Sequence, residues 1–149
     1  FLINGGIEML RSFIKDIDEE AVTHNAEILK KQFATEIDFL RNARHYYQYG
    51  KLLITHAGFD STAENWQDTS EQDFLWIREH YLQPNQTGLI NIFGHTPTRN
   101  MHKIDDIWIS PCQSYIGIDG GCAYGGQLNA LLISEQGEIL ETFVEHSDK

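Results

Sequence analysis

Two short apolar runs, each ending in a histidine beside a glycine, constrain this chain more than any other feature. Leu52–Thr55 leads into His56-Ala57-Gly58, and Ile90–Phe93 leads into Gly94-His95. Apolar runs of this kind, bounded by glycine and rich in isoleucine and leucine, are typical of buried strands. Ligands of open α/β sheets bind beyond the carboxyl ends of the strands. The sequence therefore predicts that both imidazoles lie at one edge of one sheet.

A pair of histidines at such an edge has two interpretations. Neutral imidazole is the commonest metal-ligand side chain, and the small residues beside His56 and His95 leave room for an ion. The alternative is that each histidine merely ends a strand and is satisfied by backbone carbonyls. The residues alone leave both interpretations open.

Charge and composition bound the function classes. The chain has 149 residues, 41% of them hydrophobic, and a net charge of −11, which suits one domain with its own core. From Leu52 onward there are four Lys/Arg against 14 Asp/Glu. Such a surface repels nucleic acid and anionic membranes, so neither is expected as a partner. Two cysteines without a C-x-x-C motif and no signal peptide favour a cytoplasmic protein.

The periodicity divides the chain into two parts. Residues 1–50 are predicted to be mainly helical, with two consecutive helices broken near Gln32–Thr35 and the second continuing to Gly50. Residues 51–145 are predicted to be rich in strands, with one further helix from about Ser70 to His80. We expect a single α/β domain over 1–149. Because the chain starts on Phe1 and runs at once into further apolar residues, we also expect it to be a piece of a longer protein.

Four motifs carry a family resemblance, reinforced by Asn4-Gly5-Gly6 near the start. Together they resemble the C-terminal half of a calcineurin-like metallophosphoesterase, specifically the bacterial branch of the phosphoprotein phosphatases. One motif would be weak, because Gly-His is common by chance, whereas four in the family's order are specific. They are Leu53-Ile54-Thr55-His56-Ala57-Gly58, Leu75-Trp76-Ile77-Arg78-Glu79, Phe93-Gly94-His95-Thr96-Pro97 and Ile118-Asp119-Gly120-Gly121-Cys122-Ala123-Tyr124-Gly125-Gly126-Gln127-Leu128.

The resemblance implies a four-layer αββα fold and a two-metal centre that hydrolyses phosphate esters. It makes His56 and His95 ligands of one ion, and Arg78 a contact of the substrate phosphate. Tyr124 falls, less specifically, at the place of an aromatic residue that lines the family's active site. The two divalent ions could be manganese, iron or zinc. The substrate could be phosphoserine or phosphothreonine in a protein, or a dinucleoside tetraphosphate cleaved symmetrically.

The family's three N-terminal motifs have no match here. Gly-Asp-x-His-Gly, Gly-Asp-x-x-Asp-Arg-Gly and Gly-Asn-His-Asp/Glu supply the bridging aspartate, the ligands of the other ion and the catalytic histidine. We therefore expect the chain by itself to be inactive, to need the N-terminal half of the same domain as its partner, and to self-associate through unpaired strand edges. The other interpretation is a non-catalytic binding or scaffolding module that kept the fold.

Several single residues have ordinary interpretations. Arg78 could be a surface arginine paired with Glu79 or Asp73, and Asp119 is expected to end a strand before a Gly-Gly turn rather than to bind metal. The two cysteines, Cys112 and Cys122, are expected to be small buried hydrophobic residues. The remaining histidines are expected at the surface: His24, His45, His80, His102 and His146.

Overall fold

The structure, a computed structural model, describes residues 5–14 and 22–148. Asn4 of the Asn-Gly-Gly segment lies outside these residues. The chain forms two compact units, Phe1–Ala43 and Arg44–Lys149, which we describe one at a time. The boundary between them falls between Ala43 and Arg44.

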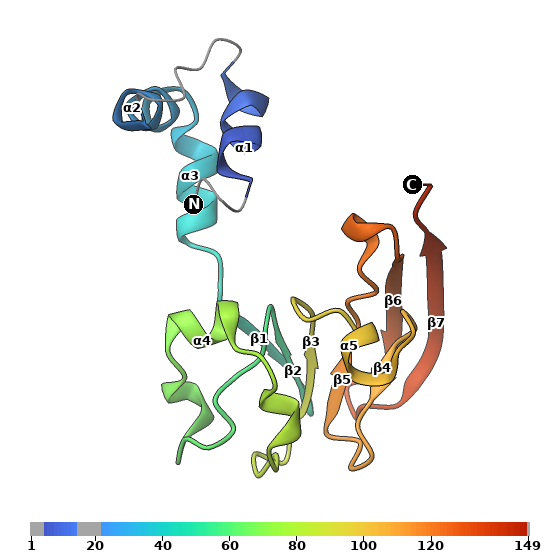
Figure 1. Cartoon of the computed structure of the whole chain (residues 1–149). Helices are drawn as coiled ribbons and strands as arrows, with labels where there is room; N and C mark the ends of the chain where they lie inside the picture. Colours follow the sequence, from blue (N-terminus) through green and yellow to red (C-terminus); the bar gives the residue numbers. More distant parts are fainter. Residues whose placement is uncertain (1–4, 15–21, 149) are drawn as a thin grey trace. The chain divides into compact units, whose positions relative to one another are not determined.

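The first unit is helical. It contains α1 (Gly6–Phe13), α2 (Val22–Gln32) and α3 (Ala34–Arg41), seen in blue to cyan in Figure 1. Phe33 separates α2 from α3 because its φ of −124° and ψ of 37° are not helical, which confirms the predicted break. The Phe33 ring meets the edge of Phe13 at a centroid distance of 4.9 Å, so the break also carries an apolar contact to α1.

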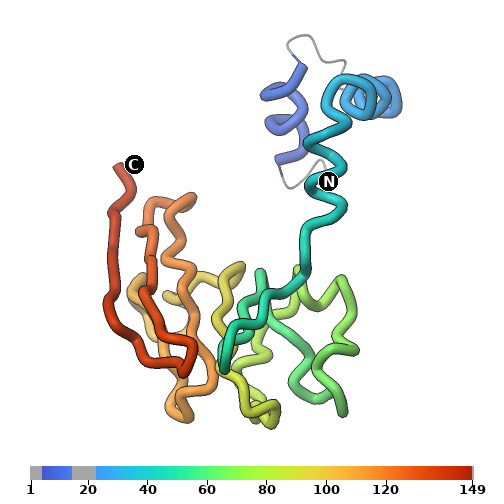
Figure 2. Tube along the Cα trace, turned by 180° about the vertical axis from the view of Figure 1, so that it is seen from behind, coloured from blue at the N-terminus to red at the C-terminus, as the bar shows by residue number. Residues whose placement is uncertain are grey.

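The second unit is built on a mixed five-stranded sheet with the order β1-β2-β3-β5-β4. The three central strands are parallel and both edge strands are antiparallel to their neighbours. The chain is therefore α/β, as the sequence predicts. Figures 1 and 2 show this sheet from opposite sides. Its strands are β1 (Tyr46–Tyr49), β2 (Leu52–Thr55), β3 (Ile90–Phe93), β4 (Trp108–Ile109) and β5 (Tyr115–Gly117).

The two faces of the central strands carry separate cores because side chains alternate along a strand. On one face Leu53, Phe93 and Tyr115 are buried together with Phe59 and Phe74. Phe74 belongs to the helix α4 (Glu71–Trp76), so that helix covers this face. The short helices η2 (Trp66–Asp68), η3 (His80–Leu82) and α5 (Arg99–His102) each add a partly buried residue to the same core.

The other face is covered by a hairpin. Strands β6 (Gln127–Ile133) and β7 (Ile139–His146) pair antiparallel as a second sheet. Leu131 and Ile133 of β6 pack against the core of Leu52, Ile92 and Ile116. The turn at Gln136-Gly137 joins them, as the sequence predicts. Two sheets therefore stack in this unit, and the η4 turn (Cys122–Tyr124) leads into the second one.

Two elements differ from the prediction, since the helix expected to reach His80 ends at Trp76 and the second helix of the first part ends before Gly50. The helical period through Ala43 and Tyr47 does not continue to Gly50, because Tyr46–Tyr49 forms the edge strand β1 instead. Aromatic residues favour a pleated surface that packs on a neighbour. Tyr46 packs on Trp66 and Phe74, while Tyr47 and Tyr49 are about half exposed.

Candidate functional site

The ends of β2 and β3 bring His56 and His95 together. These strands are parallel neighbours, and the Gly94 amide just past β3 donates to the carbonyl of His56 at 2.9 Å. The two imidazole rings have a centroid distance of 5.1 Å and an interplanar angle of 54°. The structure thus places both residues at one edge of one sheet, and their role as metal ligands stays a prediction.

His95 is held in an unusual environment. Its φ of 64° is left-handed, a conformation that costs free energy for a residue with a side chain. Its Nε2 atom is buried without a hydrogen-bond partner among the described residues, and the Trp76 ring stands nearly perpendicular to the imidazole at a centroid distance of 5.3 Å. Burial lowers the pKa of His95, and Arg78 and His56 lower it further, against an opposing effect of Asp119. The imidazole is therefore neutral near pH 7, the form that binds a metal ion.

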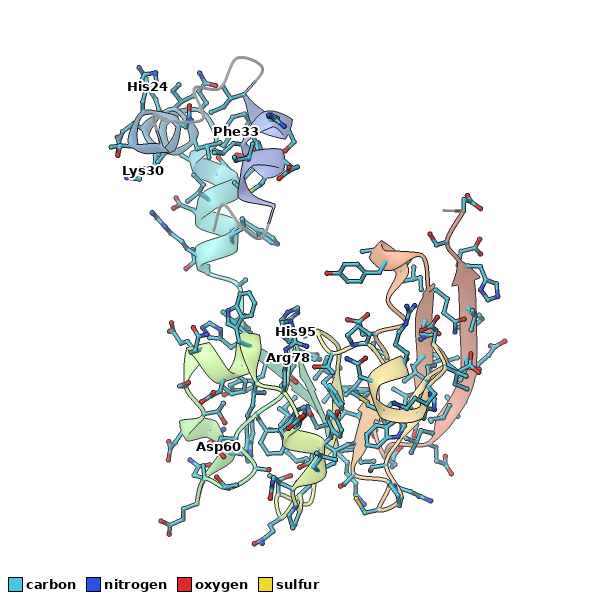
Figure 3. The ribbon with its side chains drawn as sticks, viewed as in Figure 1. His24, Lys30, Phe33, Asp60, Arg78 and His95 are labelled. Atoms are coloured by element: carbon cyan, nitrogen blue, oxygen red, sulfur yellow. The ribbon has the colours of Figure 1, made fainter. Side chains whose placement is uncertain are left out.

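Arg78 lies next to this pair, just beyond the end of α4. Its Nη1 atom donates to Oγ1 of Thr96 at 3.3 Å, and Thr96 is itself buried. Figure 3 shows the Arg78 and His95 side chains side by side. No ion pair joins Arg78 to Glu79, Asp73 or another carboxylate among the described residues. The guanidinium thus keeps donors for an anionic ligand.

Asp119 follows β5, the third parallel strand of the sheet. Its Oδ1 accepts from the Gly121 amide at 2.9 Å and its carbonyl accepts from the Thr98 amide at 2.8 Å. These bonds are the ones expected of an aspartate that ends a strand ahead of a Gly-Gly turn. They also tie the loop of His95 to the loop that carries Tyr124.

Tyr124 stands apart from the two histidines. It lies in the η4 turn with 81% of its surface exposed, and no ring contact links it to a histidine within residues 5–14 and 22–148. Its proposed place in an active site rests on the resemblance alone.

The residues present fit part of a metal centre. Among the described residues, no group of three or more His, Cys, Asp or Glu side chains is arranged to hold a metal ion. His56 and His95 fit two coordination positions of one ion, because the rings are adjacent and the Nε2 atom of His95 has no other partner. Every further ligand would have to come from elsewhere.

The prediction that His80 lies at the surface is wrong. His80 is only 3% exposed, and its Nε2 is 3.0 Å from Oδ1 of Asn91. Burial lowers its pKa to about 4, against the effect of the Asn91 hydrogen bond. A signal was present: Asn91 interrupts an otherwise apolar strand, and a buried amide needs polar partners.

The prediction that Cys112 is a small buried hydrophobic residue is also wrong. Its thiol is exposed and lies 3.3 Å from the Ser110 hydroxyl and 3.1 Å from that of Ser114. These hydrogen bonds lower the pKa of Cys112 to about 7. Cys122 is partly buried.

Comparisons with known proteins add no relative. Scans of protein-family models, of curated proteins and of solved structures found no match to this chain. In the described part of the chain, no helix is long and apolar enough to span a membrane.

Proposed function

We propose that this chain is the C-terminal half of a calcineurin-like metallophosphoesterase, and that the complete protein hydrolyses a phosphate ester with two divalent ions. One observation carries the proposal. His56 and His95, from two separate motifs, meet at the ends of neighbouring parallel strands, and Arg78, from a third motif, lies beside them. If the three short motifs matched the family only by chance, their side chains would not be expected to lie together in the structure.

The arrangement of the second unit supports the proposed fold. A mixed sheet has a helix on one face and a two-stranded sheet on the other. This order corresponds to three of the layers expected of a four-layer αββα fold. The strand edges at β1 and β7 are where strands of an N-terminal half, or of a second copy of the chain, would add.

His56 and His95 would hold one of the two ions, which could be manganese, iron or zinc. Bound divalent ions in such a centre polarise the phosphoryl group and supply a nucleophilic hydroxide. The chain's own residues prepare that position. Burial and the nearby Arg78 keep His95 neutral, and Trp76 packs against its ring, so the imidazole is available and fixed in orientation.

Arg78 would bind the phosphoryl oxygens. A guanidinium matches a tetrahedral oxyanion with two parallel hydrogen bonds, and the bond to Thr96 holds the Arg78 side chain next to His95. The ester would be phosphoserine or phosphothreonine in a protein. The alternative substrate is a dinucleoside tetraphosphate. The acidic balance of this half disfavours nucleic acid and anionic membranes as partners, and we propose a cytoplasmic protein.

Two imidazoles and one arginine do not complete a two-metal centre, so we propose that the chain alone is inactive. The rival function is a binding or scaffolding module that kept the fold without the chemistry. The sequence encoded before Phe1 separates the two. If the protein is an enzyme, the three N-terminal motifs must be encoded there. If they are missing, and the intact protein does not hydrolyse p-nitrophenyl phosphate with Mn²⁺, the scaffolding function is supported.

A direct test of the metal position uses the 149-residue chain. Paramagnetic Mn²⁺ should broaden the NMR signals of the His56 and His95 imidazoles before those of His102, a partly exposed histidine bonded to the Asp106 carbonyl. His95→Ala should abolish the preferential broadening at His56, whereas His102→Ala should leave it unchanged. Equal broadening of all the histidines would contradict a metal position at this edge.

A further inference from the structure

One cavity of the second unit lies away from the histidine pair and is lined mostly by polar residues. Its volume is about 570 Å³, within the roughly 300–1,000 Å³ of small-molecule sites. Two loops form it, residues 60–66 after β2 and residues 83–87 before β3. Figure 3 shows Asp60 well separated from His95 and Arg78. The residues that give the cavity its chemistry are Asp60, Ser61, Glu64, Asn65, Trp66 and Gln83.

The charged residues that line the cavity are all negative. Asp60 and Glu64 contribute carboxylates, and the residues that line the cavity include no lysine or arginine. Neither carboxylate forms an ion pair with a described residue. Hydrogen bonds from the side chain and amide of Thr62 lower the pKa of Asp60, so this carboxylate is charged at neutral pH. The negative charge of the wall therefore disfavours an anionic ligand and favours a cationic one.

The Asp60 carboxylate is oriented as well as charged. Its Oδ1 accepts from the amide and the hydroxyl of Thr62 at 2.9 and 2.6 Å. Its own amide donates to Thr69 at 3.0 Å. A hydrogen bond from the Ala63 amide also lowers the pKa of Asp60, so several bonds hold this carboxylate in one orientation at the cavity wall.

Trp66 adds a rigid aromatic wall. Its ring packs against Tyr46 with a centroid distance of 4.9 Å and adjoins the main core, so it does not need to be ordered by a ligand. An aromatic face together with carboxylates is the combination that recognises organic cations. The carboxamides of Asn65 and Gln83 add acceptors for further N–H groups.

A buried polar atom lies behind the same wall. Tyr115 is 0% exposed. Burial raises the pKa of Tyr115, and a hydrogen bond with the side chain of the wall residue Ser61 acts against that rise. Ser61 therefore links the cavity wall to the buried core beneath it.

We propose that this cavity binds an organic cation with a guanidinium or primary ammonium group, such as an arginine side chain. The carboxylates of Asp60 and Glu64 neutralise its charge, and Trp66 packs against its face. This site is separate from the histidine pair, so its occupancy does not depend on metal or on phosphatase activity.

The test is isothermal titration of the 149-residue chain with Nα-acetyl-L-argininamide, with Nα-acetyl-L-citrullinamide as the neutral probe of nearly the same shape. The arginine probe should bind, and the citrulline probe should bind about tenfold more weakly or not at all, because it loses the charge-assisted bonds. Glu64→Gln should weaken the arginine probe about two- to fivefold, as expected for an exposed ion pair. Glu141→Gln, which removes an exposed carboxylate on β7, serves as the charge-matched control and should change nothing.

Three results would overturn the proposal. Equal binding of both probes would make the cavity a site for neutral polar ligands. An equal loss in Glu64→Gln and Glu141→Gln would reduce the effect to the general negative field of the unit. No binding of the arginine probe, in a chain whose tryptophan fluorescence shows it to be folded, would leave the cavity without this function. Trp66→Phe, which keeps an aromatic contact to Tyr46, should weaken binding without unfolding the chain.

Discussion

The buried His80 should make the second unit sensitive to mild acid. Its ring is enclosed by Phe59, Phe93 and Tyr115. Protonation would place a charge in these apolar surroundings, with Asn91 as the one polar group bonded to the ring. Burial therefore lowers the pKa from 6.5 to about 4.

The sign and size of the effect follow from proton linkage. Between these two pKa values the unfolded chain binds a proton that the folded chain does not, so stability rises with pH in this window. The contribution of His80 is fully present above pH 6.5 and decreases as the pH falls. At about 1.36 kcal/mol per pKa unit, the loss reaches about 3 kcal/mol at pH 4. This is a large part of the 5–15 kcal/mol that typically stabilises a domain.

The assay is urea unfolding followed by tryptophan fluorescence, because Trp66, Trp76 and Trp108 all lie in the second unit. His80→Gln removes the titrating group and keeps an amide that can bond to Asn91. The difference in unfolding free energy between the native chain and this variant should shrink by about 3 kcal/mol from pH 7 to pH 4. Groups that titrate equally in both proteins cancel in this difference. A difference that stays constant over that range would refute the reasoning.

Three further predictions concern the site and its support. In the intact protein, His95→Ala should lower metal content, measured by elemental analysis, and should abolish hydrolysis of p-nitrophenyl phosphate; full metal content with near-normal turnover would mean that His95 is not a ligand. Arg78→Ala should leave metal content unchanged and lower kcat/KM about 10- to 150-fold, since a charge-assisted contact contributes about 1.5–3 kcal/mol, and Thr96→Val should give a smaller loss in the same direction. An unchanged kcat/KM would make Arg78 a surface residue. Gly58→Ala should destabilise the second unit by about 2 kcal/mol or more in urea unfolding, because its φ is 153° and an added Cβ would lie 2.4 Å from the His80 ring; stability equal to the native chain would show that His80 can move aside.

The strands of the site could be predicted from the sequence because their signals are local. Leu52–Thr55 and Ile90–Phe93 are short, apolar and bounded by glycine. Both strands occur as expected, and as parallel neighbours they bring His56 and His95 to the same sheet edge. The strand β1 could not be predicted in this way, because its signal is not local. Its tyrosines fit a helical period as well as a strand, and only the pairing with β2 decides between the two.

Burial of single polar residues could not be predicted, because it depends on contacts between distant segments. His80 is enclosed by rings from a loop, β3 and β5, none of which adjoins it in sequence. The acidity of Cys112 depends on two serine hydroxyls held by the turn before β5. The cavity likewise forms where residues 60–66 meet residues 83–87, so no local sequence pattern predicts it.

His80 and His95 share one feature, and the contrast between them shows what a candidate ligand requires. Each has a ring nitrogen that is buried and has no hydrogen-bond partner in residues 5–14 and 22–148, Nδ1 in His80 and Nε2 in His95. The His80 ring is closed in by aromatic rings and by Gly58, so the missing bond is a cost of packing. His95 follows the end of a strand, is only partly buried, and lies beside a second imidazole and the guanidinium of Arg78. An unsatisfied nitrogen is therefore a sign of a ligand position at His95, where a second donor converges on the same place, and not at His80.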